Sequence, residues 1–212
     1  FSNSSGPIVA DGKVILGLAG CARYIPEDCY ISAHDANTGE LEWRFNTIAK
    51  ANELGGDTWG ELPDQFRAGG ETWITGSYDP DLKLTYWGTA QQKPWVPVSR
   101  HLTINDVGLF TNSTVAVSTD TGELDWFFQH VPAEALDLDE VFERILVNRG
   151  DDKLVFSLGK YGILWKNDRV SGEFQAYKET VFQNAFTDID DETGLVTYRE
   201  DIQNAKLNEW TS

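Results

Sequence analysis

The sequence predicts an all-β protein assembled from repeated four-stranded units. Short runs of β-branched and aromatic residues alternate with turns rich in Gly, Asp, Asn and Pro, as in successive hairpins. A Thr-Gly-Glu-Leu-acid-Trp motif occurs at residues 38–43 and again at residues 121–126. The interval between the copies fits two units of roughly 40 residues, the usual length of a four-stranded blade.

Composition is ordinary for a soluble globular protein, with 41% hydrophobic and 24% charged residues among 212. The 34 acidic and 17 basic residues give a formal net charge of −17, which repels nucleic acid and anionic membranes, so we expect neither as a partner. No long apolar run predicts a membrane span. The sequence contains no Met and no recognisable signal peptide, which predicts a processed product or an excerpt from a longer protein.

The hairpin pattern continues along most of the chain. Residues 8–18 contain two short strands around an Asp-Gly turn, a strong hairpin signal. Residues 31–45 and 115–128 each place the Thr-Gly motif between two strands. Weaker copies of this turn occur within residues 163–174 and 190–197.

Residues 69–95 form the most distinctive stretch. The pattern predicts a strand at residues 72–75, an Asp-Pro-Asp turn and a returning strand at residues 82–89. This stretch contains three tryptophans, whose flat rings suit stacking on a planar ligand. One more ordinary hairpin is the alternative interpretation.

The sequence TWITGSYDPDLKLTYWGTAQQKPW resembles one blade of the PQQ-dependent (quinoprotein) alcohol and methanol dehydrogenases. That blade carries a tryptophan beneath pyrroloquinoline quinone (PQQ). The resemblance extends from about Ser4 to Trp210 and implies an eight-bladed β-propeller. Residues 1–212 would form a partial propeller domain of roughly four consecutive blades, about half of the ring. It also implies that Trp43 and Trp126 pack between blades against glycine turns.

The resemblance assigns quinone contacts to three residues. Trp73 would stack beneath the ring, and Lys160, in the turn of a hairpin at residues 154–166, would polarise the quinone carbonyl oxygens. Ser4 would donate a hydrogen bond to the quinone. The alternatives are a solvated lysine at a turn and a surface serine near a fraying terminus.

The resemblance also implies a base and metal ligands. Asp137 matches the residue that serves as catalytic base and metal ligand, and Gln91 replaces an Asn ligand with an amide one methylene longer. Asp139 adds a second carboxylate, and this Asp-x-Asp spacing resembles members that use a lanthanide instead of calcium. A trivalent ion gains more than a divalent ion from one further anionic ligand. An acidic loop or the start of a short helix is the alternative for Asp139.

One loop departs from the family pattern. Cys21 and Ala22 stand where the family has an Ala-Glu pair whose Glu binds the metal. Glu27 and Asp28 are candidates to replace that carboxylate, and a solvated acidic loop is the alternative. Cys21 and Cys29 suit a disulfide in an oxidising compartment, against the alternative of two buried thiols.

The function implied is oxidation of a small alcohol to an aldehyde or ketone, with PQQ and either calcium or a lanthanide as cofactors. A cytochrome c-like electron acceptor, a periplasmic location, and either the rest of the propeller or a second copy as partner follow from the same resemblance. A non-catalytic propeller that serves as a binding scaffold is the alternative, because one fold can host unrelated functions. Other enzyme classes lack support: the three histidines, His34, His101 and His130, have no zinc spacing.

Overall fold

The computed structural model describes residues 2–21, 29–94 and 96–204, which are almost entirely strands and loops. Three antiparallel sheets have four strands each, in chain order, and a fourth has two. The first contains β1 (Ile8–Ala10), β2 (Lys13–Leu16), β3 (Tyr30–Asp35) and β4 (Leu41–Asn46). The second contains β5 (Ser77–Asp79), β6 (Leu84–Gly88), β7 (Ser113–Ser118) and β8 (Leu124–Gln129). The third contains β9 (Ile145–Arg149), β10 (Asp152–Leu158), β11 (Ile163–Asp168) and β12 (Phe174–Glu179).

Shorter elements complete the chain. The two-stranded sheet pairs β13 (Phe186–Ile189) with β14 (Val196–Tyr198), and the helix α1 (Glu200–Gln203) follows it. Three single-turn 3₁₀ helices lie in the long connections, at Gly56–Trp59, Asp64–Phe66 and Pro97–Arg100.

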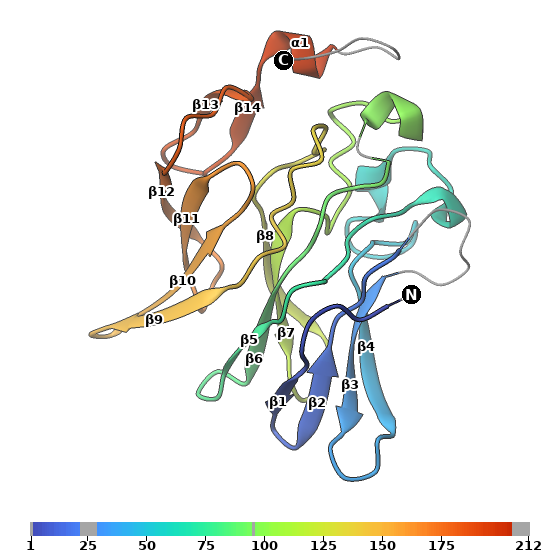
Figure 1. Cartoon of the computed structure of the whole chain (residues 1–212), viewed down its shortest axis with the longest axis vertical. Helices are drawn as coiled ribbons and strands as arrows, with labels where there is room; N and C mark the ends of the chain where they lie inside the picture. Colours follow the sequence, from blue (N-terminus) through green and yellow to red (C-terminus); the bar gives the residue numbers. More distant parts are fainter. Residues whose placement is uncertain (1, 22–28, 95, 205–212) are drawn as a thin grey trace.

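The sheets are arranged as the consecutive blades of a propeller. Strand β1 contacts β5, and β5 contacts β9, so the first strands of successive sheets lie together. Figure 1 shows the three sheets following one another in chain order like segments of a fan. The all-β blade architecture is therefore confirmed. Of the roughly four blades expected, three are complete, and the β13–β14 pair carries the Thr-Gly turn that joins the last two strands of a blade.

Aromatic side chains of each fourth strand pack against the Thr-Gly or Ser-Gly turn of the next sheet. A Cβ atom at Gly122 would lie 2.6 Å from the Trp43 ring, so only glycine leaves room for the indole. The Trp43 Nε1 donates a hydrogen bond of 2.9 Å to the Thr119 carbonyl in the same turn. Trp126 repeats the arrangement on Gly172. The prediction that these tryptophans pack between blades is confirmed.

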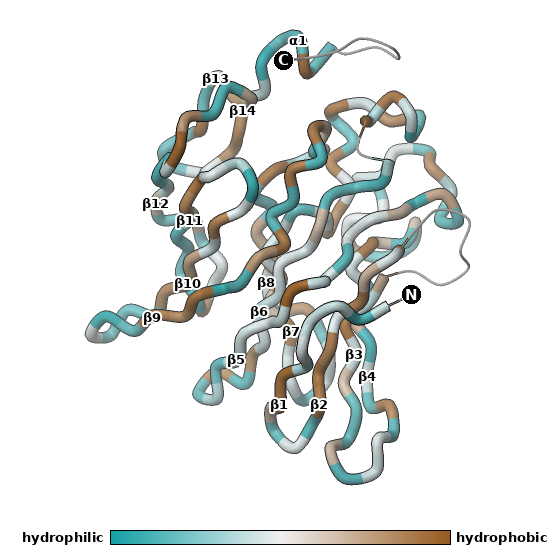
Figure 2. The backbone as a smooth tube through the Cα atoms, in the orientation of Figure 1, coloured by the Kyte–Doolittle hydropathy of each residue, from teal (hydrophilic) through white to brown (hydrophobic). Residues whose placement is uncertain are grey.

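Phe174 packs in the same way on the Gly194 turn of the β13–β14 pair. An aromatic ring therefore serves at a third blade junction, although it is not a tryptophan. Figure 2 shows hydrophobic stretches along β1 and β2 and hydrophilic residues at the tip of the β9–β10 hairpin. The interface between blades is thus sealed by rings on glycines rather than by further strand pairing.

The prediction of a strand at residues 72–75 is wrong, because β5 begins only at Ser77. Residues 70–76 lie outside any strand, and the backbone N–H groups of Gly70 and Thr72 bond outside the predicted hairpin. Gly70 N–H donates to the Gln91 carbonyl, and Thr72 N–H donates to the Leu18 carbonyl. The hairpin itself begins later, at β5, and its returning strand β6 agrees with the prediction.

The Cys21–Cys29 disulfide is present, with the two Cα atoms 5.5 Å apart. Both cysteines are buried in a small cluster with Leu18, and Tyr30 packs against it. The pairing confirms the expected disulfide. Ala22, Glu27 and Asp28 lie outside the described residues.

Candidate functional site

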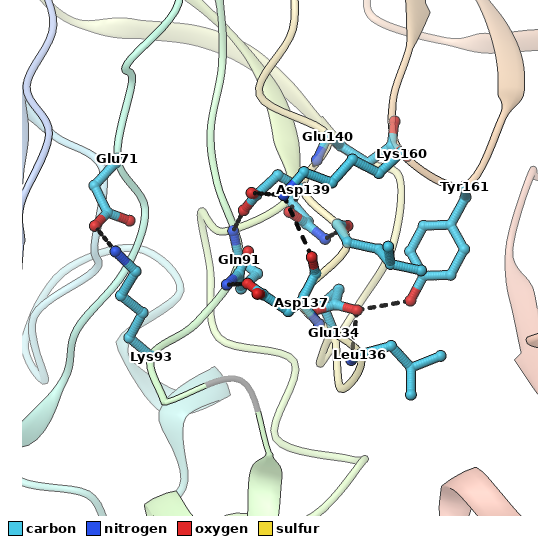
Figure 3. Close-up of polar contacts among 12 residues, drawn as sticks. Glu71, Gln91, Lys93, Glu134, Leu136, Asp137, Asp139, Glu140, Lys160 and Tyr161 are labelled. Atoms are coloured by element: carbon cyan, nitrogen blue, oxygen red, sulfur yellow. Dashed lines mark hydrogen bonds and ion pairs between the residues drawn. The ribbon is translucent and has the colours of Figure 1, made fainter. Parts of the chain in front are cut away.

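Four of the predicted site residues form one connected cluster. Gln91 Nε2 donates to Asp137 Oδ1 at 2.5 Å, and the Gln91 backbone N–H donates to Asp139 Oδ1 at 3.0 Å. The Lys160 ammonium lies 2.7 Å from Asp139 Oδ2 and 3.4 Å from the Asp137 carbonyl oxygen. Figure 3 shows these side chains converging between three loops. The cluster therefore combines an amide, two carboxylates and one ammonium.

The fold explains why residues so distant in sequence meet. Gln91 follows β6, and Asp137 and Asp139 follow β8. Strands β6 and β8 are both antiparallel to β7, so they end at the same edge of their sheet. Lys160 lies in the turn after β10 of the next sheet, and its backbone N–H donates to the Asp139 carbonyl at 3.1 Å.

Ser4 and Trp73 meet each other beside this cluster. The Ser4 hydroxyl donates to the Trp73 carbonyl at 3.2 Å, and Ser4 itself is exposed. The half-buried Trp73 ring packs edge-on against Phe142, with centroids 5.5 Å apart. Phe142 belongs to the same β8–β9 loop as Asp137, so the ring predicted to stack on a quinone contacts the loop that carries the predicted base.

The donor set agrees in chemistry with a hard cation. Asp137 and Asp139 supply carboxylate oxygens, and Gln91 Oε1 is buried without a hydrogen-bond partner among the described residues. A buried amide oxygen left unpaired is costly, and a bound cation would satisfy it. Within residues 2–21, 29–94 and 96–204, no group of three or more His, Cys, Asp or Glu side chains is placed to hold a metal ion. An ion here would therefore depend on the Gln91 amide and on oxygens from outside this set.

Sequence reasoning missed Glu134, which is fully buried three residues after the end of the Gln-His-Val segment. Its Oε1 accepts from the Leu136 N–H and from the Tyr161 hydroxyl, both at 2.7 Å. Its Oε2 accepts from the Asp137 N–H at 3.0 Å. Burial raises the pKa of Glu134, and the bonds from Tyr161 and the backbone oppose that rise.

Two further buried acids adjoin the cluster. Glu71, two residues before Trp73, forms an ion pair with Lys93, and burial raises the pKa of its carboxyl group against the effect of that lysine. Glu140 is fully buried beside Arg144; its pKa is raised by burial, and the guanidinium opposes the rise. The run of acids at residues 134–140 was the available signal, but acids in a loop are usually solvated.

Arg144 fixes the far side of the β8–β9 loop. The guanidinium is buried, donates from Nε to Thr114 Oγ1 at 2.7 Å and from Nη2 to the Glu140 carbonyl at 2.8 Å. It also donates to the Phe142 carbonyl. Bonds to a buried guanidinium hold the backbone on which Asp139 and Phe142 lie.

Blades closed by aromatic rings on glycine turns, with a polar cluster on loops at one edge, define this chain as a segment of a β-propeller. A family model described as "PQQ: Glucose/ethanol/alcohol dehydrogenase, beta-propeller domain" matches residues 1–176. The chain therefore belongs to this family of PQQ dehydrogenase propellers. The membership inferred from the sequence motifs is confirmed.

Two curated relatives illustrate the similarity. Quinohemoprotein alcohol dehydrogenase ADH-IIG of Pseudomonas putida is 32% identical over 92% of this chain and 29% of its own length. The dehydrogenase subunit of alcohol dehydrogenase (quinone) of Gluconobacter oxydans is 30% identical over 95% of this chain and 29% of its own length. The chain thus spans less than a third of the curated relatives that it matches.

Solved structures agree with the fold. The quinohemoprotein alcohol dehydrogenase ADHIIG from Pseudomonas putida HK5 matches with a TM-score of 0.84 and 32% identity, over 96% of this chain and 32% of that one. A europium-containing methanol dehydrogenase matches with a TM-score of 0.77 and 23% identity, over 93% of this chain and 37% of that one, and so supports the fold alone. In the described part of this chain, no helix has the length and apolar character needed to span a membrane.

Proposed function

We propose that the whole protein oxidises a small alcohol to an aldehyde or ketone, with PQQ as the electron acceptor. The observation that carries this proposal is the contact of Gln91, Asp137, Asp139 and Lys160, which three separate loops bring together. Packing of the propeller does not require an amide, two acids and a lysine at one point. Membership of the PQQ dehydrogenase family supports the same reaction class.

Asp137 is the general base of the proposed reaction. Its Oδ1 accepts a hydrogen bond from Gln91 Nε2, which orients the carboxylate. The carboxylate would remove the hydroxyl proton of the alcohol as the carbonyl forms. When bound, PQQ supplies the acceptor for the two electrons, and a divalent or trivalent cation supplies Lewis acidity.

Trp73, Ser4 and Lys160 would bind and polarise the quinone. Trp73 offers a ring held edge-on by Phe142, and the Ser4 hydroxyl donates to the Trp73 backbone carbonyl. The Lys160 ammonium is poised at the carboxylate of Asp139, where its charge can also stabilise electron density on a reduced quinone. Gln91, Asp137 and Asp139 would hold calcium or a lanthanide through oxygen atoms.

The remaining partners follow from the same proposal. The Cys21–Cys29 disulfide supports an oxidising compartment, and we propose the periplasm. Electrons would leave to a cytochrome c-like acceptor. The rest of the propeller, or a second copy of this chain, would cover the blade faces at either end of the segment.

The test is alcohol-dependent dye reduction by the full-length protein loaded with PQQ and either calcium or lanthanum. Asp137→Asn keeps the side-chain volume but removes the base, and we expect kcat to fall by about 100-fold or more. Asp152→Asn is the matched control, because this exposed acid pairs with Arg149 at the surface. A folded wild-type protein that binds no PQQ with either ion would exclude the enzyme and favour the scaffold.

A further inference from the structure

The loop that carries Asp137 adopts a conformation that needs external support. Asp137 has a φ of +62°, in the left-handed region that a residue with a Cβ atom rarely occupies. Such a conformation is strained and persists where surrounding contacts over-determine it. Gln91 and Lys160 each bond to Asp137. One buried carboxylate, Glu134, accepts the Asp137 backbone N–H.

Glu134 closes the loop on itself. Its two oxygens accept the backbone N–H groups of Leu136 and Asp137, at 2.7 and 3.0 Å. Both acceptors are fully buried, so water cannot replace them. The Glu134 carboxylate therefore holds the backbone N–H groups that lead into Asp137.

Tyr161 ties this loop to the turn that carries Lys160. Its hydroxyl donates to Glu134 Oε1 at 2.7 Å, its ring packs on Phe186 with centroids 4.7 Å apart, and only 3% of it is exposed. Tyr161 immediately follows Lys160, whose ammonium contacts Asp139. Figure 3 shows the link between the Tyr161 hydroxyl and Glu134 beside the Asp137 and Lys160 side chains.

We propose that Glu134 and Tyr161 act together as positioning residues that fix Asp137 relative to Lys160. This inference rests on the proposed role of Asp137 as the base. Neither residue needs to touch alcohol or quinone. A displacement of a base by about 1 Å can cost 100-fold in rate. Tyr161, which reaches Asp137 through two hydrogen bonds by way of Glu134, can therefore affect kcat.

The first test needs no cofactor and no activity. Amide hydrogen exchange is measured on the full-length apoprotein for the peptide that contains residues 131–141. In Glu134→Gln one carboxylate oxygen becomes an NH₂ group, which cannot accept a hydrogen bond. In either orientation of the amide, this group faces one of the backbone N–H donors, so one of those hydrogen bonds is lost. We expect exchange in this peptide to become about tenfold faster in Glu134→Gln and in Tyr161→Phe. Tyr78→Phe is the matched control, because its hydroxyl also donates to a carboxylate, Asp11 Oδ1 at 2.8 Å, on a different turn.

The second test is steady-state kinetics of the loaded full-length protein. We expect kcat to fall about 10- to 100-fold in both variants while KM changes less than about twofold, because a misplaced base affects the chemical step and not alcohol binding. The double variant should be no slower than Glu134→Gln alone, since Tyr161 acts through Glu134. A general loss of packing would instead lower the melting temperature and the quinone loading of all these variants together.

The two measurements separate the two hypotheses. Unchanged exchange in residues 131–141 and unchanged kcat in Tyr161→Phe would overturn the positioning role, even if the wild type is an active dehydrogenase. Faster exchange in an inactive wild type would instead sustain the role of Glu134 and Tyr161 in the loop and reject the proposed base. If Glu134→Gln does not fold, Tyr161→Phe, which removes a single oxygen atom, decides the matter.

Discussion

The ammonium of Lys160 lies 2.7 Å from Oδ2 of Asp139, so a positive charge already occupies one oxygen of the carboxylate proposed as an extra metal ligand. The carboxylate is 8% exposed, whereas the lysine side chain is 36% exposed. The acid is therefore the desolvated partner, and it depends on Lys160 and on the Gln91 backbone N–H for compensation.

This pair predicts opposite effects of one substitution on metal binding and on turnover. Lys160→Met removes a positive charge beside the proposed ligands, so we expect La³⁺ to bind about 5- to 10-fold more tightly to the apoprotein in calorimetric titration. Alcohol-dependent dye reduction should fall, because the charge that stabilises the reduced quinone is lost. Lys153→Met is the control: Lys153 pairs with Asp79 and Asp81, and its loss should change neither La³⁺ binding nor dye reduction. Weaker La³⁺ binding in Lys160→Met would contradict this electrostatic account.

Packing at the blade junctions predicts that two glycines with a similar positive φ differ in how much unfolding free energy is lost on substitution by alanine. Gly122 and Gly150 have φ values of +75° and +62°, but an added Cβ would meet the Trp43 ring at Gly122 and nothing within 4 Å at Gly150. Gly150→Ala should cost about 1 kcal/mol of unfolding free energy from backbone strain. Gly122→Ala should cost a further 1 to 3 kcal/mol, roughly, from overpacking against the indole. Urea unfolding of the full-length protein measures both, and equal costs would show that the indole can move aside.

The sequence allowed the blade pattern to be predicted because its signals are local. A Thr-Gly turn followed by a tryptophan specifies a hairpin within a dozen residues. The repeat of such turns along the chain marks where each ring packs, as Trp43 does on Gly122 and Trp126 on Gly172. The strand at residues 72–75 was wrong for the same reason. Its residues follow a strand pattern, but the backbone N–H of Thr72 donates to Leu18, which is distant in sequence.

The site was predicted through resemblance rather than from spacing. Gln91, Asp139 and Lys160 lie on three loops, so no local pattern could have shown that they touch. Glu134 was missed because an acid in a loop is usually solvated and its neighbours in sequence do not indicate that it is buried. Its partner Tyr161 is 27 residues away. Buried acids of this kind become visible only when the fold shows which donors surround them.

The disulfide predicts a loss of stability on reduction. Cys21 and Cys29 are eight residues apart, so the link restricts only a short loop of the unfolded chain and contributes about 2 to 3 kcal/mol in the chain-entropy model. Cys21→Ser combined with Cys29→Ser should lower the unfolding free energy of the full-length protein by about this amount. Adding a reductant should lower the wild type to the same level and leave the double variant unchanged. A double variant as stable as the oxidised wild type would mean that the link does not restrict the unfolded state.

His130 predicts a loss of stability in mild acid. The ring is fully buried between Phe128 and Trp165, Nε2 lies 2.7 Å from Thr114 Oγ1, and burial, followed by the charge of Arg144, lowers its pKa well below 6.5. The unfolded chain therefore binds a proton near pH 6.5 that the folded chain excludes, so stability falls as the pH drops below that value.

The size of the effect follows from linkage. Between pH 7.5 and 5.5 the wild type should lose about 1.4 kcal/mol of unfolding free energy through this residue, and His130→Gln, which cannot titrate, should lack that component. Urea unfolding at both pH values measures the change in unfolding free energy for each protein. Subtracting one change from the other removes the contribution of the carboxylates, which both proteins contain. His34→Gln, at a histidine that is not buried and that contacts the Gly39 carbonyl, is the control and should follow the wild type. If the wild type and His130→Gln respond equally to pH, His130 takes up its proton in the folded protein, and its burial would then have to be relieved by movement of the β8 end away from Trp165.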